Sequence, residues 1–354
     1  MPKMDAAQKE ARIDSLQGEL TQLIEAVRTE ADEKKKRRMI TKIGSLHRQI
    51  DKIRADRILS RETKRDLVAY SFIAPNFIGF CVFTLIPIVF AFCLAFLQWD
   101  GSNPIEWVGI KNFTRLTDDI FFQAALKNTI IYCVGTVPLT MIASLALAIV
   151  LNQKVKGRGI FRTLAFFPYV ASLVAITSVW KMLFHPSKGP INNVLYNVFG
   201  VAQENLPQWF TGGLVLLSMI LFSVWKYMGY YMVIYLAGLQ GISSELYEAA
   251  SLDGAGTWAK FRYVTWPQLS STTFFVVVML TINCFKVYDI AVMLAGGGSG
   301  ELTTSSTVLV YYIYQKAFID WDLGYSSAVA MVLFLMVLVV TIIQFRGQAK
   351  KERA

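Results

Sequence analysis

EAASLDGAGTWAKFRYVTWPQL, residues 248–269, is a mixed polar stretch between two long apolar runs. Helix-forming residues continue up to Leu252, and Asp253 and Gly254 then interrupt the helical pattern. Helical spacing resumes beyond the glycine and stops at a proline, through Trp258, Phe261, Val264 and Pro267. The pattern predicts two short helices that meet at Gly254. Amphipathicity alone does not distinguish a docking surface from an ordinary loop.

The composition is that of a membrane protein with several spans. Apolar residues make up 54% of the 354 residues, charged residues make up 17%, and the mean hydropathy is +0.44. The apolar residues fall in blocks of about 20 or more, the length that a helix needs to cross roughly 30 Å of hydrocarbon. We predict an all-α polytopic membrane protein with six transmembrane helices near residues 68–97, 126–151, 163–184, 212–239, 269–293 and 326–345.

The charges between these spans indicate the orientation of the chain. One set of connections is basic and holds Lys154, Lys156, Arg158, Arg162, Lys260, Arg262, Arg346, Lys350, Lys351 and Arg353. The other set is richer in acid and holds Asp100, Glu106, Asp118, Asp119, Glu204, Glu301, Asp320 and Asp322. Basic loops stay in the cytoplasm, so both termini and residues 248–269 are expected there. We therefore interpret the net charge of +10 as a signal for orientation in the lipid bilayer and not as a sign of nucleic-acid binding.

Residues 1–66 precede the first span and show two heptad stripes. One stripe holds Ile13, Leu16, Leu20, Leu23 and Val27, and the other holds Met39, Ile43, Leu46, Ile50 and Ile53. The charged segment 30–38 separates them. A helical hairpin, a single helix with a shifted seam, and a solvated basic tail all fit this pattern. We predict a cytoplasmic, coiled-coil-like extension over 1–66, followed by a six-span domain over 67–354 that contains a loop at 241–268.

The residue order within 248–269 is more specific than its amphipathicity. It reads Glu-Ala-Ala, two residues, Asp-Gly-Ala, five residues, Phe, two residues, Val, two residues, Pro, one residue, Leu. With this order the chain resembles the sugar-uptake permeases of bacterial ATP-binding-cassette (ABC) importers, the maltose and glycerol-phosphate type. Further phrases similar to that family include Trp99-Asp100-Gly101, Val108-Gly109-Ile110-Lys111-Asn112-Phe113, Gly159-Ile160-Phe161-Arg162, Phe167-Pro168 and Val287-Tyr288-Asp289.

The resemblance implies a permease subunit of the bacterial inner membrane, which couples closure of an ATPase to alternating access. Its expected partners are a second homologous permease subunit, an ATPase dimer, an extracytoplasmic solute-binding protein and a carbohydrate substrate. The residues that the family motif assigns to ATPase coupling are Glu248, Ala249, Ala250, Leu252, Asp253, Gly254, Phe261 and Pro267. The extension over 1–66 is longer than most family members carry, so the resemblance implies no role for it.

No catalytic residues are predicted in this chain. The sequence lacks Gly-x-x-x-x-Gly-Lys-Ser/Thr, and its glycine stretch at 296–300 is followed by Glu301 in an outer loop. ATP and Mg are therefore expected in the partner ATPase, with no cofactor bound here. Neither of the two histidines, His47 and His185, has ligands at metal-binding spacing, so no metal site is predicted.

A carbohydrate site needs aromatic rings for stacking and side chains that form hydrogen bonds. Two polar clusters inside predicted spans offer both, and the corresponding spans line the sugar site in maltose-type relatives. The candidate substrate residues are Tyr227, Tyr230, Tyr231, Thr281, Asn283, Cys284, Lys286 and Tyr288. Interface anchoring and contact between helices are alternative roles for any of them.

The charge of the substrate and the function of the chain both have alternatives that stay open at this point. Lys226 and Lys286 suit an anionic substrate, or Lys286 pairs with Asp289 on the same helix face. An ion-driven secondary transporter is one alternative function, although Asp289 is the only candidate carboxylate for it. A permease for a non-sugar solute and a membrane anchor with a recruiting coiled coil are the others.

Overall fold

The structure, a computed structural model, describes residues 6–153, 156–295 and 303–353. Nearly all the described elements are helices, and the only strands among the described residues are β1 (Leu97–Gln98) and β2 (Glu106–Trp107), which pair antiparallel. This confirms the predicted all-α membrane fold. By packing, the chain divides into Met1–Ile88 and Val89–Ala354.

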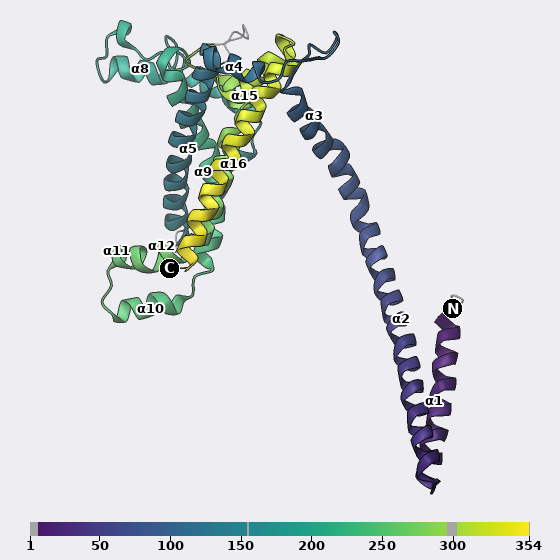
Figure 1. Cartoon of the computed structure of the whole chain (residues 1–354). Helices are drawn as coiled ribbons and strands as arrows, with labels where there is room; N and C mark the ends of the chain where they lie inside the picture. The colour runs from purple at the N-terminus through teal and green to yellow at the C-terminus, as the bar shows by residue number, and fades with distance from the viewer. Residues whose placement is uncertain (1–5, 154–155, 296–302, 354) are drawn as a thin grey trace. The chain divides into compact units, whose positions relative to one another are not determined.

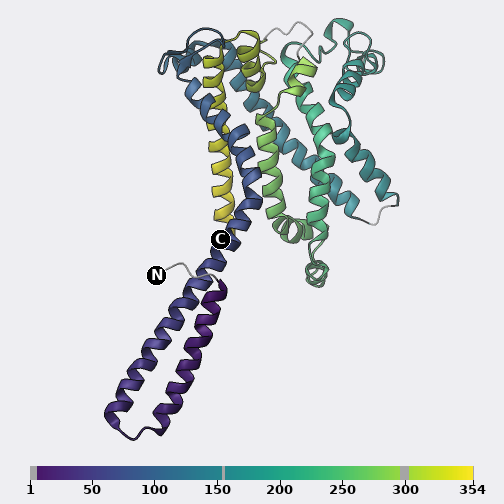
Figure 2. The same ribbon diagram turned by 90° about the vertical axis from the view of Figure 1, so that its right-hand side faces the viewer.

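The first unit contains a helical hairpin. Helices α1 (Ala6–Thr29) and α2 (Glu33–Phe80) run antiparallel, as Figure 2 shows. Both predicted stripes meet in its core, where the buried residues are Ile13, Leu16, Leu46 and Ile50. The turn is fixed by Asp32, whose Oδ1 accepts a hydrogen bond from the Lys34 amide at 2.9 Å. Of the three arrangements that fit the heptads, the structure therefore shows the hairpin.

Helix α2 continues directly into the first candidate span, Arg65–Leu94. A π turn, η1 (Cys81–Leu85), separates α2 from α3 (Ile86–Leu94), and Pro87 is the second residue of α3. Proline lacks an N–H and crowds the carbonyl four residues earlier, so a wider turn at this point relieves the clash.

The second unit is a helical bundle with short elements at both ends (Figure 1). Its long helices are α5 (Ile120–Asn152), α9 (Val215–Gln240), α13 (Ser270–Phe285) and α16 (Leu323–Arg353). The shorter helices are α4 (Lys111–Asp118), α6 (Arg158–Val170), α7 (Leu173–Leu183), α8 (Pro190–Asn197), α10 (Ser244–Leu252), α11 (Thr257–Lys260), α12 (Trp266–Gln268), α14 (Asp289–Ala295) and α15 (Leu309–Tyr314). Single turns complete it at η2 (Gln203–Asn205), η3 (Gly212–Leu214), η4 (Phe261–Thr265) and η5 (Gln315–Ile319).

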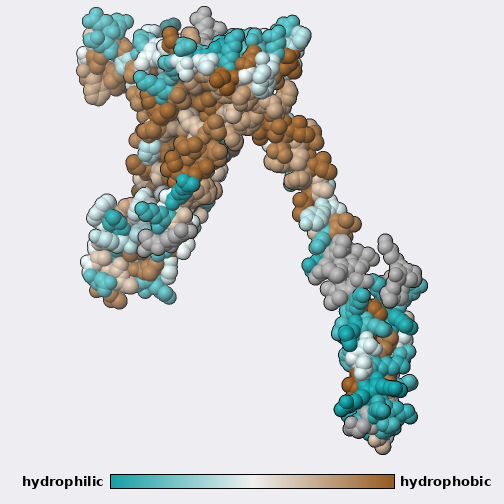
Figure 3. All heavy atoms as spheres, in the orientation of Figure 1, coloured by the Kyte–Doolittle hydropathy of each residue, from teal (hydrophilic) through white to brown (hydrophobic). Residues whose placement is uncertain are grey.

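The third of the six predicted spans is bent, and the fifth begins at a bend. Four helices are long and apolar enough to cross a membrane alone, and the count reaches six when each of two bent pairs is taken as one span. Arg158–Val170 and Leu173–Leu183 meet at 98°, and Thr257–Gln268 and Ser270–Phe285 meet at 66°. The predicted fifth span, 269–293, also ends early, because α13 stops at Phe285 and α14 begins at Asp289. Figure 3 shows hydrophobic residues around the middle of the bundle and hydrophilic residues toward its ends.

The core of this unit is the contact between α5 and α9. Gly135 of α5 faces α9 so closely that an added Cβ would lie 2.7 Å from the side chain of Ile220, and Thr136 and Thr140 of α5 are fully buried. Small side chains let two helix backbones approach closely, which is the main source of helix association in a membrane. A hydrogen bond of 2.7 Å between Tyr132 Oη and Ser223 Oγ joins the two helices.

Asp119 ties together the start of α5, the helix α15 and the start of α16. Its Oδ1 caps α5 by accepting from the amides of Phe121 and Phe122 at 2.9 and 3.1 Å. Its Oδ2 accepts from the hydroxyls of Tyr312, on α15, and Tyr325, on α16. Partial burial works against the charged form of the carboxylate, but the hydrogen bonds from these tyrosines and amides prevail and lower the pKa of Asp119.

Gly229 on α9 provides a test of the packing between α9 and α6. A Cβ atom at this position would lie 1.8 Å from the carbonyl oxygen of Ala165, whereas one at Gly159 would meet nothing within 4 Å. Gly229→Ala must push the two helices apart, so we expect it to lower the stability by roughly 1–3 kcal/mol. Thermal unfolding of the detergent-solubilised protein measures this loss. Gly159→Ala on α6 is the matched control and is expected to unfold at the wild-type temperature or above it; equal effects would contradict the close approach.

Candidate functional site

The stretch that the sequence singled out forms an elbow, defined here as residues 243–269, at the end of the bundle away from α8 (Figure 1). Its first arm is α10, which begins where Ser243 Oγ accepts from the Glu245 amide at 3.3 Å. The arm ends at Leu252 as predicted, and Gly254 follows with φ of 75°. The Gly254 amide donates to the backbone carbonyl of Ser251 at 3.1 Å, and the Ala255 amide donates to the backbone carbonyl of Ala250 at 2.9 Å. This is the Schellman arrangement, which needs a residue in the left-handed region and therefore favours glycine.

The second arm corrects one prediction. It runs through α11, η4 and α12, so the helical chain does not stop at Pro267 but includes it near the start of α12. The π turn η4 comes directly before α12 and accommodates the proline, which cannot donate to a carbonyl in the preceding turn. The arm ends at Gln268, and the chain bends by 66° into α13.

Two side-chain contacts hold the arms together. Tyr247 Oη lies 3.0 Å from Thr265 Oγ1, and Lys260 Nζ donates to Ser251 Oγ at 2.7 Å. The sequence analysis did not assign roles to these four residues. The spacing of Tyr247 and Ser251 could have indicated a shared contact, because residues four apart lie on one helix face.

The predicted coupling residues divide between a free surface and an anchor. Glu248, Ala249, Leu252, Asp253, Gly254 and Pro267 are exposed, and Leu252 is 90% exposed. Ala250 and Phe261 are partly buried, and Phe261 packs on the apolar cluster between α5 and α9. Trp258 and Tyr263, on the second arm, are 74% and 76% exposed, so both arms of the elbow present apolar side chains on their surface.

A cavity of about 590 Å³ lies farther along the bundle, between the bent third span, α9 and the end of α13. Six of the eight predicted substrate residues line it, namely Tyr227, Tyr230, Tyr231, Asn283, Lys286 and Tyr288. Asn283 Nδ2 donates to Tyr231 Oη at 3.2 Å and so joins α13 to α9. The cavity thus presents phenol rings beside an amide, an ammonium and the carboxylate of Asp289.

Thr281 and Cys284 do not line this cavity. Thr281 is buried, donates to the Val277 carbonyl at 2.7 Å and accepts from Gln344 on α16 at 2.9 Å. Cys284 is buried in the cluster around Tyr132 and Phe222. Both residues fall on the opposite side of the helix turn from Asn283 and Lys286, so a cluster contiguous in sequence is divided between two faces.

Tyr169, at the end of α6, is a cavity residue that the sequence analysis missed. Its ring stacks on Tyr230 with centroids 4.4 Å apart and planes at 18°. Tyr227 meets the same ring nearly edge-on at 6.3 Å. The signal was its position directly after Phe167-Pro168, because a proline near a helix end places the next side chains at a break in the span.

Lys226 has a structural role at that break. It is buried, and its Nζ donates to the carbonyls of Pro168 and Tyr169 at 3.3 and 3.4 Å. The last carbonyls of a helix have no partner in their own helix, and in a membrane they need one from elsewhere. Lys286 is exposed at the cavity, and among the described residues no ion pair joins it to Asp289. The predicted pairing of these two charges is therefore not seen.

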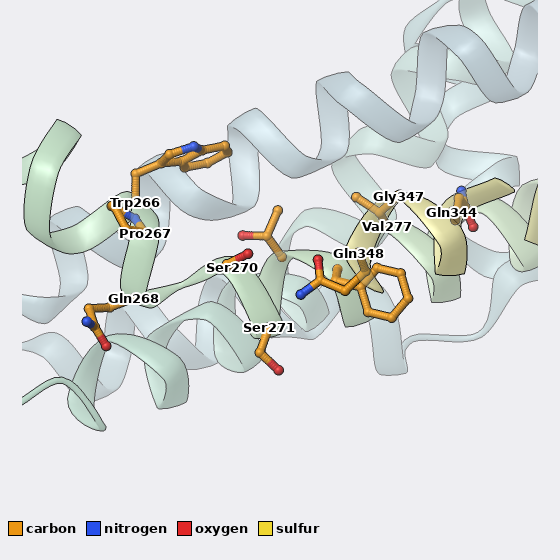
Figure 4. A pocket seen from close by; sticks show the side chains of 11 residues that line it. Trp266, Pro267, Gln268, Ser270, Ser271, Val277, Gln344, Gly347 and Gln348 are labelled. Carbon is orange, nitrogen blue, oxygen red and sulfur yellow. The ribbon is translucent and has the colours of Figure 1, made fainter. Parts of the chain in front are cut away.

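A larger cavity of about 730 Å³ lies beside the elbow, at the same end of the bundle (Figure 4). The start of α13 and the end of α16 form it, with Ser270, Ser271, Gln344 and Gln348 among its lining residues. Of all the predicted site residues, only Pro267 lines this cavity. The stacked tyrosines make the smaller cavity the better candidate for a sugar ring.

The two lysines give a matched pair of variants. Lys226→Met leaves two backbone carbonyls without a donor at the end of α6, so we expect a loss of roughly 1–3 kcal/mol in stability. Lys286→Met changes an exposed side chain and is expected to stay within about 0.5 kcal/mol of the wild type. Thermal unfolding of both variants in the same detergent compares them. Equal stability of the two would contradict the role assigned to Lys226.

Comparisons with known proteins agree with this architecture. The family described as "Binding-protein-dependent transport system inner membrane component" matches residues 145–350, which include the elbow and the tyrosine-lined cavity. The lactose transport system permease protein LacF of Rhizobium radiobacter is 34% identical, over 81% of this chain and 95% of its own length. The arabinooligosaccharides transport system permease protein AraP of Bacillus subtilis is 33% identical, over 80% of this chain and 90% of its own.

A solved structure shares the fold. It is a chain of a bacterial ABC transporter involved in the import of the acidic polysaccharide alginate, with a TM-score of 0.72 and 22% sequence identity, over 82% of this chain and 98% of that one. The family match and the relatives together confirm the resemblance seen in the sequence. The chain therefore belongs to the inner-membrane components of binding-protein-dependent transport systems, and it is a permease of the ABC importer type.

Proposed function

We propose that this permease carries a sugar or a short oligosaccharide through the cavity formed by Tyr169, Tyr227, Tyr230 and Asn283. The observation that carries the proposal is the stack of Tyr169 on Tyr230, which exposes phenol rings and hydroxyls inside the membrane-spanning part. Sugar rings bind to aromatic faces and exchange hydrogen bonds with amide and hydroxyl groups. Relatives named for lactose and arabinooligosaccharides support the same class of solute.

The charges of the cavity favour a neutral substrate over an anion. Lys226 is engaged by two carbonyls, which leaves Lys286 as the cation among the described cavity residues that can reach a solute. Asp289 lines the same cavity, so a negative charge offsets the positive charge of Lys286 there. A uronate or phosphate would be attracted by Lys286 but repelled by the carboxylate of Asp289.

The energy for transport comes from a separate ATPase dimer, which binds ATP and Mg and docks on the elbow. The exposed Leu252 and Glu248 on α10 would contact that partner, while Phe261 fixes the elbow to the bundle. A second homologous permease subunit would complete the pathway, and a solute-binding protein outside the membrane would deliver the sugar. The elbow and both termini would face the cytoplasm, as the basic connections predict.

The contacts of the elbow supply a route from the ATPase to the substrate. A push on α10 reaches Thr265 through Tyr247 and enters α13 at the 66° bend. Helix α13 is a single rod of 16 residues, and it carries Asn283 to the cavity. Displacement of α13 against α9 would break the bond between Asn283 and Tyr231, and so change the side from which the solute can enter.

Uptake measurements test the substrate class. In cells that express the complete transporter, Tyr230→Ala removes the ring stacked on Tyr169, and we expect the KM for uptake of labelled lactose or arabinotetraose to rise roughly fivefold. Tyr230→Phe keeps the ring and is the control, with a KM within about twofold of the wild type. Faster uptake of acidic sugars than of neutral ones would contradict the neutral class. Uptake that persists without the ATPase would favour the ion-driven alternative.

A glycine pair tests the elbow. Proline cannot adopt the φ of 75° found at Gly254, so Gly254→Pro is expected to disrupt the elbow and abolish uptake while the chain still inserts in the membrane. Gly256 has φ of −70° and ψ of 173°, values that proline accepts, so Gly256→Pro is the matched control and should retain most uptake. Glu248→Lys reverses an exposed charge and is also expected to uncouple uptake. Wild-type transport by Gly254→Pro would refute the role of the elbow.

A further inference from the structure

The segment between α7 and α9 encloses a second polar cavity at the outer end of the bundle. This outer cavity has a volume of about 620 Å³ and lies where α8 and its flanking loops fold over the end of α7. Small-molecule sites have volumes of roughly 300–1,000 Å³. The space is therefore large enough for a ligand of one or two sugar units, and no part of the transport mechanism above uses it.

A buried asparagine holds the walls of the outer cavity in place. Asn192 is 2% exposed, and its Nδ2 donates to the carbonyls of Pro186 and Pro207 at 2.7 and 3.1 Å. Its Oδ1 accepts from Trp209 Nε1 at 2.7 Å. One side chain thus joins three points of the loop, and the walls are ordered before any ligand arrives. Pre-ordered walls reduce the entropy that binding must overcome.

The lining offers hydrogen bonds without net charge. Tyr196, Gln203 and Gln208 line the cavity, and none of their side chains has a recorded partner within the described part of the chain. His185 uses Nδ1 to accept from the amides of Ser187 and Lys188 at 3.3 and 3.2 Å, which leaves Nε2 for a ligand. No lysine, arginine or carboxylate is among the lining residues. Amides that donate and accept, next to one phenol ring, match the hydroxyl-rich surface of a neutral sugar.

A row of aromatic rings connects this loop to the helix that lines the membrane cavity. Trp209 meets Phe184 edge-on at 5.2 Å, and Phe184 stacks on Trp180 at 4.8 Å. Trp180 in turn contacts Phe222 and Trp225 on α9, at 5.2 and 5.5 Å. Lys226 and Tyr227, the next residues of α9, line the membrane cavity. The outer cavity is therefore fixed to the same rigid element as the transport site.

We propose that the outer cavity is a second carbohydrate-binding site, which holds neutral sugar units outside the membrane-spanning cavity. Its ligand class rests on the proposed function of the chain, but its position and residues do not. Such a site would retain an oligosaccharide at the outer end while its other end enters the membrane cavity. It predicts tighter binding of tetrasaccharides than of disaccharides.

The test measures binding to the purified full-length chain in lipid nanodiscs. Maltotetraose and arabinotetraose are titrated while ligand binding is followed by saturation-transfer NMR, with trigalacturonate as an acidic comparison. The double variant Tyr196→Ala/Gln203→Ala is expected to weaken the binding of at least one neutral tetrasaccharide roughly tenfold, because it removes the ring and one amide. The double variant Phe199→Ala/Glu204→Ala changes neighbouring residues that do not line the cavity, and it should bind as the wild type does.

Several outcomes would overturn the proposal. These are the absence of binding by either tetrasaccharide, preferential binding of trigalacturonate, or unchanged binding in Tyr196→Ala/Gln203→Ala. Loss of affinity for the solute-binding protein alone, with sugar binding intact, would assign the outer cavity to a protein contact instead. The Tyr230→Ala variant separates this proposal from the proposed function: it should slow uptake yet keep most tetrasaccharide binding at the outer cavity. If it slows uptake while the outer double variant binds normally, only the outer site fails.

Discussion

The end of α6 inside the membrane-spanning part is the constraint on which the candidate site depends. A helix that stops there leaves carbonyls without partners, and hydrocarbon offers no water to replace them. Lys226 on α9 donates to two of these carbonyls, and Gly229, one turn further along α9, lets α6 approach until the backbones touch. Together these contacts hold Tyr169 against Tyr230 and create the aromatic wall of the cavity. The 98° bend of the third span is therefore part of how the site is built.

Helix α13 connects the elbow to the cavity. Helix α13 receives its orientation at the bend after α12 and delivers Asn283 to the tyrosines of α9. The elbow can act as a rigid body because Tyr247, Ser251, Lys260 and Thr265 join its two arms directly. A flexible loop would absorb a push from a partner protein, whereas a braced one transmits it. Under the proposed function, this bracing would carry the motion of a docked ATPase into α13.

The features that could be predicted from the sequence are those that local interactions determine. The end of α10 at Leu252 and the turn at Gly254 follow from helix propensity and from the φ that glycine tolerates, and the structure shows both. The contact that satisfies the carbonyls at the bend of the third span could not be predicted, because Lys226 lies 58 residues away from Pro168 in the chain. Thr281 and Cys284 were placed with Asn283 because they are neighbours in sequence, but packing turns them toward α16 and α5.

The same division between local and distant interactions applies to the extension and to Tyr169. Heptad stripes put Leu16 and Leu46 on apolar helix faces, yet only the packing of one helix on the other distinguishes a hairpin from a single long helix or a solvated tail. Tyr169 lay outside both polar clusters in the sequence, and it joins them only because α6 crosses α9.

Asp119 fastens three helices to one another at one end of the bundle. This one carboxylate holds the start of α5, α15 and the start of α16, and Arg115 adds an ion pair of 2.9 Å with Asp322 at the same level. Helices fastened at one end rotate about that point, so the separation of α5 and α16 changes least near Asp119 and most at the opposite end. Rotation about Asp119 would therefore move the ends of α5 and α16 near the elbow farther than the ends held by this carboxylate.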